Sequence, residues 1–233
     1  MIRRFSMAVL LSVLSLSAWT KEASALVVVT GHGGSALTVL SKGSGQTPMN
    51  GIGYCYGGTL MWQPGNGKSL SIFALGLAAK QISSRYTENN IEKNGTYTLF
   101  GPQIGLTAVM SESISLQGLV LYSPASSLTT ISSHSIAVNG ESFHYSTWEN
   151  YKGRGAIEGR LTLVHDKVSG QFSKQNRFRS GIGLSYSVQS FTDSTTKIST
   201  SREALTPSET SSSDRVSYSF VTVTLDLFLG ISF

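Results

Sequence analysis

Hydrophobic residues along most of this chain alternate with small or polar residues, at the period of two that is typical of β-strands. From Ile52 to Trp62 the even positions carry large apolar or aromatic residues, apart from Gly58. From Val221 to Phe233 every odd position is apolar, whereas Asp226 has the opposite parity. No comparable stripe with the 3.6-residue period of a helix follows the first 25 residues. The chain is therefore predicted to be all-β.

Extending the alternation along the chain predicts eight strands in an antiparallel, up-and-down arrangement. Several of them exceed the ~5–6 residues usual in globular proteins and reach the ~9–11 residues that a strand needs to cross a bilayer. This length favours a transmembrane β-barrel over a soluble sheet. The predicted strands are 33–42, 50–62, 70–84, 97–110, 113–122, 156–165, 178–191 and 216–233, and Leu26–Val29 share the parity of the first one.

The polar residues inside these strands favour the same fold. If the apolar-rich parity of each strand faces outward, the charged residues and glutamines of the strands face the barrel interior. A charge facing lipid near the middle of the bilayer would cost ~2–4 kcal/mol, and this register avoids that cost. The residues predicted to face the interior are Lys42, Lys80, Gln103, Gln117, Glu158, Arg160, Arg179, Gln189 and Asp226.

The connections between the predicted strands differ in length. Segments 63–69 and 111–113 are short, whereas 86–96, 123–155 and 192–214 are long and rich in Ser and Thr. Outer-membrane barrels combine short periplasmic turns with long outer loops. The pattern therefore predicts which end of the barrel faces the cell exterior.

Composition narrows the class of protein. Charged residues make up 13% of the 233 residues, roughly half the ~25% of an average domain, while 40% are hydrophobic. This balance excludes a disordered chain, and one cysteine, Cys55, excludes a disulfide scaffold. The formal net charge of +5, without a stripe of Lys and Arg, does not indicate nucleic-acid binding.

The first 25 residues are typical of a secretory signal peptide. Arg3 and Arg4 precede a short apolar run, and Ala23-Ser24-Ala25 forms a cleavage site with small residues. We expect residues 1–25 to be removed and residues 26–233 to form the barrel domain; the alternative is an N-terminal anchor helix.

The last predicted strand, with Leu229, Ile231 and a terminal Phe233, resembles the closing strand of bacterial outer-membrane β-barrel proteins. With eight strands the chain resembles the small OmpA/OmpX-type barrels, and the segments 101–104 and 114–119 are similar to a central hairpin of the OmpX/Ail group. The resemblance implies a Gram-negative outer membrane. It also implies that the barrel-insertion machinery reads the last strand.

An eight-stranded barrel has room inside only for its own side chains, so we expect a plugged interior and a structural or surface-interaction role. The expected partners are outer-membrane lipid, lipopolysaccharide and a host or surface ligand that the loops do not specify. We expect a monomer without a cofactor. Aromatic residues near strand ends, Trp62, Tyr122 and Phe191, are predicted to form interfacial girdles.

Candidate chemistry in the sequence is limited to one constellation. The four histidines lack metal-ligand spacing, so no metal site is expected. His144, Ser146 and Glu158 resemble the catalytic residues of PagL-type lipid A deacylases, in which a Ser nucleophile, a His base and a carboxylate hydrolyse an ester. This enzyme, a gated narrow channel and a soluble β-sandwich adhesin remain the alternatives to a non-enzymatic barrel.

Overall fold

The computed structural model describes residues 25–43, 48–64, 73–88, 91–111, 113–138, 141–168, 177–202 and 208–232. Among these residues no helix is long and apolar enough to cross a membrane. All regular elements are strands: β1 (Ala25–Ser41), β2 (Met49–Pro64), β3 (Phe73–Glu88), β4 (Ile91–Val109), β5 (Ile114–Ser123), β6 (Ser127–Val138), β7 (Glu141–Val168), β8 (Arg177–Arg202) and β9 (Ser208–Ser232). The predicted signal peptide and Phe233 lie outside the described residues.

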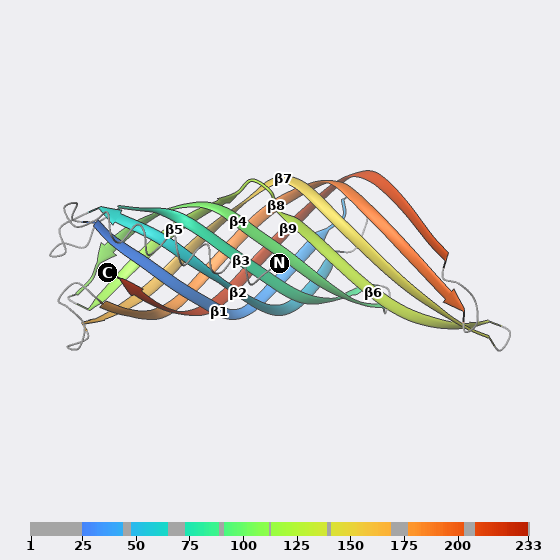
Figure 1. The fold of residues 1–233 in the computed structure, drawn as a ribbon, viewed down its shortest axis with the longest axis horizontal. Coiled ribbons are helices and arrows are strands. Elements are labelled where there is room, and N and C mark those ends of the chain that lie inside the picture. Colours follow the sequence, from blue (N-terminus) through green and yellow to red (C-terminus); the bar gives the residue numbers. More distant parts are fainter. Residues whose placement is uncertain are drawn as a thin grey trace.

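The strands form one antiparallel sheet that closes on itself (Figure 1). Neighbours along the chain pair from β1 to β4 and from β7 to β9, and β1 pairs with β9 to close the ring. Where it is closed the ring contains eight strands, because β5 and β6 occupy the same position between β4 and β7. The predicted eight-stranded antiparallel barrel is thus confirmed.

A short interruption divides the fifth strand of the ring into β5 and β6. Pro124 stands at the break, where its missing N–H cannot contribute to a ladder. On the facing strand, β7, the register with β8 shifts between Lys152 and Ala156, and Gly155 has a φ of 130°. A left-handed backbone of this kind suits glycine, and the Cβ of any other residue here would lie 3.0 Å from the carbonyl oxygen of Ser123.

The strands are longer than the alternation predicted. β7, β8 and β9 have 28, 26 and 25 residues, far more than the ~9–11 needed to cross a bilayer. The predicted loops 86–96, 123–155 and 192–214 are consequently wrong as loops: most of their residues continue the strands into long hairpins. Ser and Thr, which the sequence analysis assigned to loops, also favour a solvated strand surface when they pair across strands.

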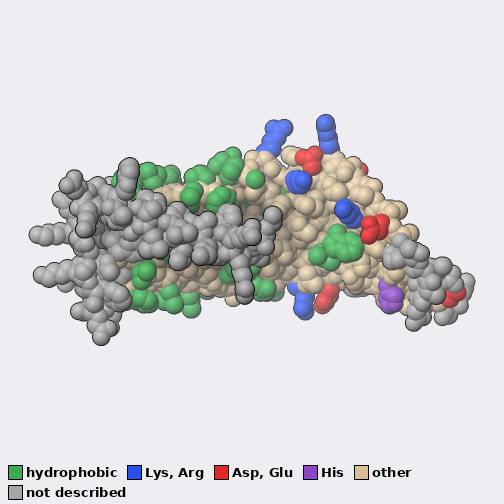
Figure 2. Space-filling view, viewed as in Figure 1, with side chains coloured by type: hydrophobic (Ala, Val, Ile, Leu, Met, Phe, Trp, Pro, Cys, Tyr) green, Lys and Arg blue, Asp and Glu red, His purple; other side chains and the backbone are tan. Residues whose placement is uncertain are grey.

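Most exposed apolar residues lie in one half of the barrel, which we call the apolar band; Ile131, Ile136, Trp148 and Ile198 are exposed in the other half. It contains the outward residues of β3 from Phe73 to Leu77, of β4 from Phe100 to Leu106, and of β9 from Val223 to Ile231. On the face seen in Figure 2 most of the visible hydrophobic side chains lie on this half, and charged side chains gather, beside one hydrophobic patch, over the half that ends in the β6–β7 and β8–β9 hairpins. The barrel therefore has an apolar half and a polar half along its axis.

Beyond the apolar band the ring opens into a protruding sheet formed by β6, the first half of β7, the second half of β8 and the first half of β9. The pairing of β1 with β9 ends at Ser41 and Ser219, so Ser208 to Tyr218 pair only with β8 among the described residues. In the same way β6 beyond Ser132 pairs only with β7 among the residues that the structure describes. The first eight residues of β9 are solvent-exposed on both faces of the sheet.

Candidate functional site

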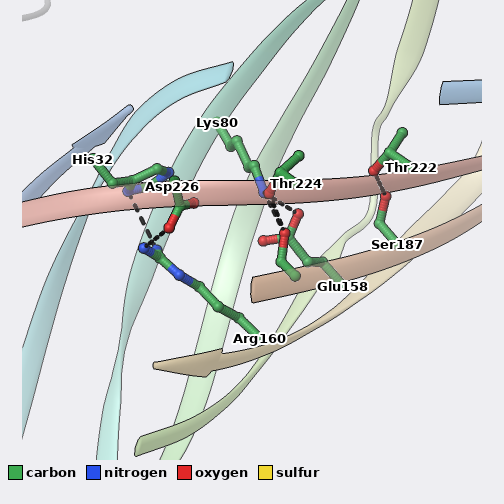
Figure 3. A network of polar contacts seen from close by, with 9 residues as sticks. His32, Lys80, Glu158, Arg160, Ser187, Thr222, Thr224 and Asp226 are labelled. Carbon is green, nitrogen blue, oxygen red and sulfur yellow. Dashed lines mark hydrogen bonds and ion pairs between the residues drawn. The ribbon is translucent and has the colours of Figure 1, made fainter. Parts of the chain in front are cut away.

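Ion pairs and hydrogen bonds fill the interior of the barrel at the level of the apolar band. The Nζ of Lys80 on β3 donates to a carboxylate oxygen of Glu158 at 2.8 Å, to the hydroxyl of Ser185 at 2.6 Å and to that of Thr224 at 2.8 Å. All three donor positions of this ammonium group are therefore used, by residues from β7, β8 and β9 (Figure 3). Lys80 connects opposite sides of the barrel through its interior.

A second group lies beside the first, around Arg160. Its guanidinium donates to Asp226 at 2.7 Å and contacts the Nδ1 of His32 at 3.3 Å (Figure 3). It also stands 6.0 Å from the centre of the Phe228 ring. Asp166 and Arg179, which are partners in the β7–β8 register, form a bidentate pair at 2.7 and 3.2 Å. Such pairing is what makes buried charges tolerable, because an unpaired one costs several kcal/mol.

An apolar layer follows further along the barrel axis. Tyr97 and Phe220 pack edge to face with ring centroids 4.8 Å apart, and Phe191 packs against both Phe220 and Tyr151 at 5.8 Å. Leu40, Met49, Ile82 and Leu128 complete this layer. Since these side chains are almost fully buried, they close the interior against water.

A third ionic group, the upper cluster, lies on the far side of the aromatic layer and beyond the apolar band. The Nζ of Lys93 lies 2.7 Å from Glu88 and 2.9 Å from Glu149, and Lys42 pairs with Glu88 at 2.6 Å. Burial alone would raise the pKa of both carboxyl groups, but the adjacent ammonium groups outweigh it and hold the pKa of Glu88 and of Glu149 below its usual value. The two carboxylates likewise hold the pKa of Lys93 above its usual value, against the effect of burial.

Nine residues were predicted to face the interior, and Lys42 is the one that is only partly buried, where it pairs with Glu88. The other eight are each at least nine-tenths buried: Lys80, Gln103, Gln117, Glu158, Arg160, Arg179, Gln189 and Asp226. Two of the glutamines each donate one hydrogen bond: Gln189 to the carbonyl of Ser126 at 3.2 Å, and Gln117 to the hydroxyl of Thr107 at 3.4 Å. The alternation therefore places these polar residues on the interior face, but it does not predict which charged residues form ion pairs.

Several partners of these charges lie beyond the predicted strand ends and were therefore not predicted from the sequence. Asp166 has the parity of Glu158 and Arg160 but follows the predicted end of its strand at residue 165. His32 has the interior parity of β1, whereas the predicted strand began at residue 33. The upper cluster was missed because Glu88, Lys93 and Glu149 fell in predicted loops. Continuing the alternation through Ser and Thr would have found His32, Glu88, Lys93 and Asp166. Parity would still have turned Glu149 outward, because the irregularity of β7 between Lys152 and Ala156 reverses the alternation on that strand.

Two of the three predicted girdle residues lie on the outer surface. Trp62 and Tyr122 are exposed, at 40% and 48%. The prediction for Phe191 is wrong: this residue has the same parity as Gln189, faces the interior and is 1% exposed within the aromatic layer. In the predicted insertion signal Leu229 and Ile231 face outward, and Phe233 lies outside the described residues.

The three residues of the deacylase hypothesis do not come together. Ser146 and Glu158 are twelve residues apart on the single strand β7, which is about 40 Å. His144 bonds Ser135 at 2.6 Å and Ser146 lies 3.2 Å from Ser133, whereas Glu158 is buried against Lys80. No carboxylate of the described residues orients the imidazole for base catalysis, so the constellation is wrong as a catalytic site. Nor do three His, Cys, Asp or Glu side chains of the described residues form a candidate metal site.

Comparison with known proteins gives no match to any family model and none to a curated protein sequence. Among solved structures, the attachment invasion locus protein Ail of Yersinia pestis is 13% identical, with 91% of this chain and 99% of Ail covered at a TM-score of 0.38. A major outer membrane protein from Thermus thermophilus is 9% identical, with 90% and 100% covered at 0.44. The outer membrane protein OprG from Pseudomonas aeruginosa is 10% identical, with 90% and 95% covered at 0.33.

Removing the amino group of Lys80 is expected to destabilise the barrel strongly. Lys80→Met leaves Glu158 buried without its cation, which typically costs about 3–5 kcal/mol. The measurement is urea-induced unfolding in lipid vesicles. Arg85→Met is the matched control, because Arg85 is exposed and lies 3.9 Å from Glu92, so about 0–1 kcal/mol is expected. Equal losses in the two variants would contradict the assignment of Lys80 as an interior hub.

Lowering the pH is expected to weaken the ion pairs of the upper cluster before it destabilises the strands of the apolar band. Carboxyl groups with lowered pKa stabilise the fold above their unfolded value of ~4.3 and lose that contribution as the pH falls through the folded value. Amide hydrogen exchange of the β3–β4 hairpin, corrected for intrinsic rates, should therefore rise between pH 7 and pH 3 more than that of β9 from Val221 to Ile231. A Glu149→Gln variant should show a smaller pH dependence. An unchanged hairpin would contradict the role of these pairs.

Proposed function

We propose that this chain is a non-enzymatic protein of the bacterial outer membrane that presents the protruding sheet at the cell surface as an interaction module. The observation that carries the proposal is the division of the barrel into an apolar band and a polar sheet with open edges. Leu225, Leu227 and Leu229 are about half exposed or more, a burial pattern that only a lipid environment makes favourable. In the protruding sheet, the part of β9 from Ser208 to Arg215 carries no exposed apolar residue.

The filled interior supports a structural role rather than transport. Paired charges occupy the barrel at the level of the band, and the aromatic layer closes it above them. A conducting channel would need a continuous path lined by polar groups with access to water. The geometry gives no support to the alternative of a narrow channel.

Cationic residues at the boundary of the band support contact with anionic lipid. Lys152 pairs in register with Asp193, and Asp193 with Arg215, on three neighbouring strands. Lys152, Arg154 and Arg215 are exposed and have no ion-pair partner within 4.0 Å among the described residues. Long cationic side chains just above an apolar band suit the phosphate groups of a lipid, and in an outer membrane these belong to lipopolysaccharide.

The open edges of the sheet support contact with other molecules rather than self-assembly. An edge strand offers unpaired N–H and C=O groups that an extended partner segment can use. On β9 this edge carries Glu209, Asp214 and Arg215, and charges on an edge oppose pairing between identical copies. We therefore propose a monomer. We also propose that the insertion machinery recognises the last strand through Leu229, Ile231 and Phe233.

Cysteine labelling of intact cells tests the proposed orientation. Cys55 is buried and should not react, so a maleimide will label only the single cysteine introduced elsewhere. Ser212→Cys on the protruding sheet should react with a membrane-impermeant maleimide on intact cells. Met110→Cys, exposed at the opposite end of the barrel, should react only after the outer membrane is permeabilised.

Leu225→Cys serves as the control for the band, since lipid should shield it from the reagent in both preparations. Labelling of Met110→Cys on intact cells without labelling of Ser212→Cys would reverse the proposed orientation. Recovery of the mature protein in the soluble fraction, with Leu225→Cys reactive, would favour the soluble alternative instead.

A further inference from the structure

The outer face of the protruding sheet carries a partly exposed indole. Trp148 on β7 is 38% exposed and lies nine residues beyond Ile157, an outward residue of the apolar band, which is about 30 Å along the strand. Glu149 next to it faces the interior and bonds Lys93, so the alternation turns Trp148 outward. Trp148 also lies four residues, about 13 Å along the strand, beyond Lys152 at the boundary of the band, so contact with the lipid interface does not account for it.

Cross-strand register places mostly polar side chains around this indole, with Ile131 as the apolar exception. Trp148 pairs with Ile131 on β6 and with Lys197 on β8. Two residues along the same face, Asn150 pairs with Thr129 and with Thr195. Hydroxyl, amide and ammonium groups therefore stand on three adjacent strands around one aromatic ring.

These side chains line a hollow of about 410 Å³, a volume in the range of small-ligand sites. Six of its eight lining residues are polar, and Ser199 and Glu209, which are register partners, form its far side. The Oδ1 atom of Asn150 is buried and has no hydrogen-bond partner in the part of the chain that the structure describes. Lys197 and Glu209 form no ion pair within 4.0 Å among the described residues, so their charged groups are available to a ligand.

We propose that this hollow binds a saccharide, with an uncharged pyranose ring against the indole of Trp148. A sugar ring presents polarised C–H groups on its faces and hydroxyl groups around its rim. The face of an indole carries negative charge density and attracts the C–H groups, while Asn150, Thr195 and Glu209 can exchange hydrogen bonds with the hydroxyls. One cation and one anion in the lining give no preference for an acidic sugar.

A saccharide fits this surface better than a protein partner does. Protein interfaces depend on a cluster of apolar anchors with a desolvated centre. Here the neighbours of the indole in the hollow are mostly hydroxyl, amide and charged groups, which match the rim of a sugar. The inference rests on the proposed function, because the hollow must face the cell exterior to meet a glycan.

The test uses the full mature protein, refolded in a zwitterionic detergent because maltoside or glucoside detergents would compete for the site. Labelled protein is applied to an array of neutral oligosaccharides that includes glucans, mannans, galactans and N-acetylglucosamine oligomers. Wild-type protein should bind a subset of them, and Trp148→Ala should weaken that binding at least tenfold. Ile131→Ala, a truncation in the same cross-strand row outside the lining of the hollow, should retain it.

Intrinsic fluorescence provides a second readout with the oligosaccharide that binds best. Trp62 and Trp148 are the tryptophans beyond the predicted signal peptide. A Trp62→Phe variant should show a saccharide-dependent shift of its emission, whereas a Trp148→Phe variant, which keeps Trp62 in the apolar band, should show none. Heat-modifiable gel migration confirms that each variant is folded.

Absence of binding to every oligosaccharide by folded protein, or binding that Trp148→Ala leaves unchanged, would overturn the inference. Binding to a glycoprotein that survives removal of its glycans and is lost in Trp148→Ala would assign the hollow to a protein partner and overturn it as well. Cysteine labelling separates these outcomes from failure of the proposed function. If Ser212→Cys is labelled on intact cells and no glycan binds, only the saccharide site is wrong.

Discussion

Closure of the backbone hydrogen bonds into a ring is the constraint on which the rest of this structure depends. A closed antiparallel sheet leaves no edge within the apolar band, so every strand there can face lipid without an unpaired backbone group. Closure also fixes two faces, and the period of two then sends each residue either outward or inward. Charges in the strands must face inward, and the narrow interior requires them to find partners there. Lys80, Arg160 and Arg179 do so with Glu158, Asp226 and Asp166.

The outward residues and the pairing of these strands change along their length, because the backbone must form a closed ring only where lipid surrounds it. Within the band the outward residues are apolar and the ring is complete. Beyond it the outward residues are mostly Ser, Thr, Asn and charged residues, the ring opens, and β9 has a free edge from Ser208 to Tyr218 among the residues described. The upper cluster of Lys42, Glu88, Lys93 and Glu149 lies where the ring begins to open and joins β3, β4 and β7 at that level. A sheet held in this way is a firm support for a surface such as the hollow beside Trp148.

Sequence alone predicted the features that follow from alternation and missed those that depend on register. The barrel, the strand count of the ring and the interior position of Lys80 and Asp226 all follow from parity. The partners of these charges depend on which residues face each other across several strands, and parity does not contain that information. Strand ends were predicted too early because apolar alternation stops at the band while pairing continues through Ser and Thr. Phe191 shows the converse error, since its aromatic character was given more weight than its parity with Gln189.

Collision accessibility of spin labels along β9 tests the central claim most directly, because this one strand runs through the apolar band and into the protruding sheet. Single labels are placed on the protein in lipid vesicles at outward residues from Ile231 to Val223 and at exposed residues from Arg215 to Ser208. Labels from Val223 to Ile231 should collide preferentially with oxygen, which is enriched in the bilayer, and labels from Ser208 to Arg215 with a water-soluble nickel complex. Equal access of the nickel complex along the whole strand would contradict the central claim.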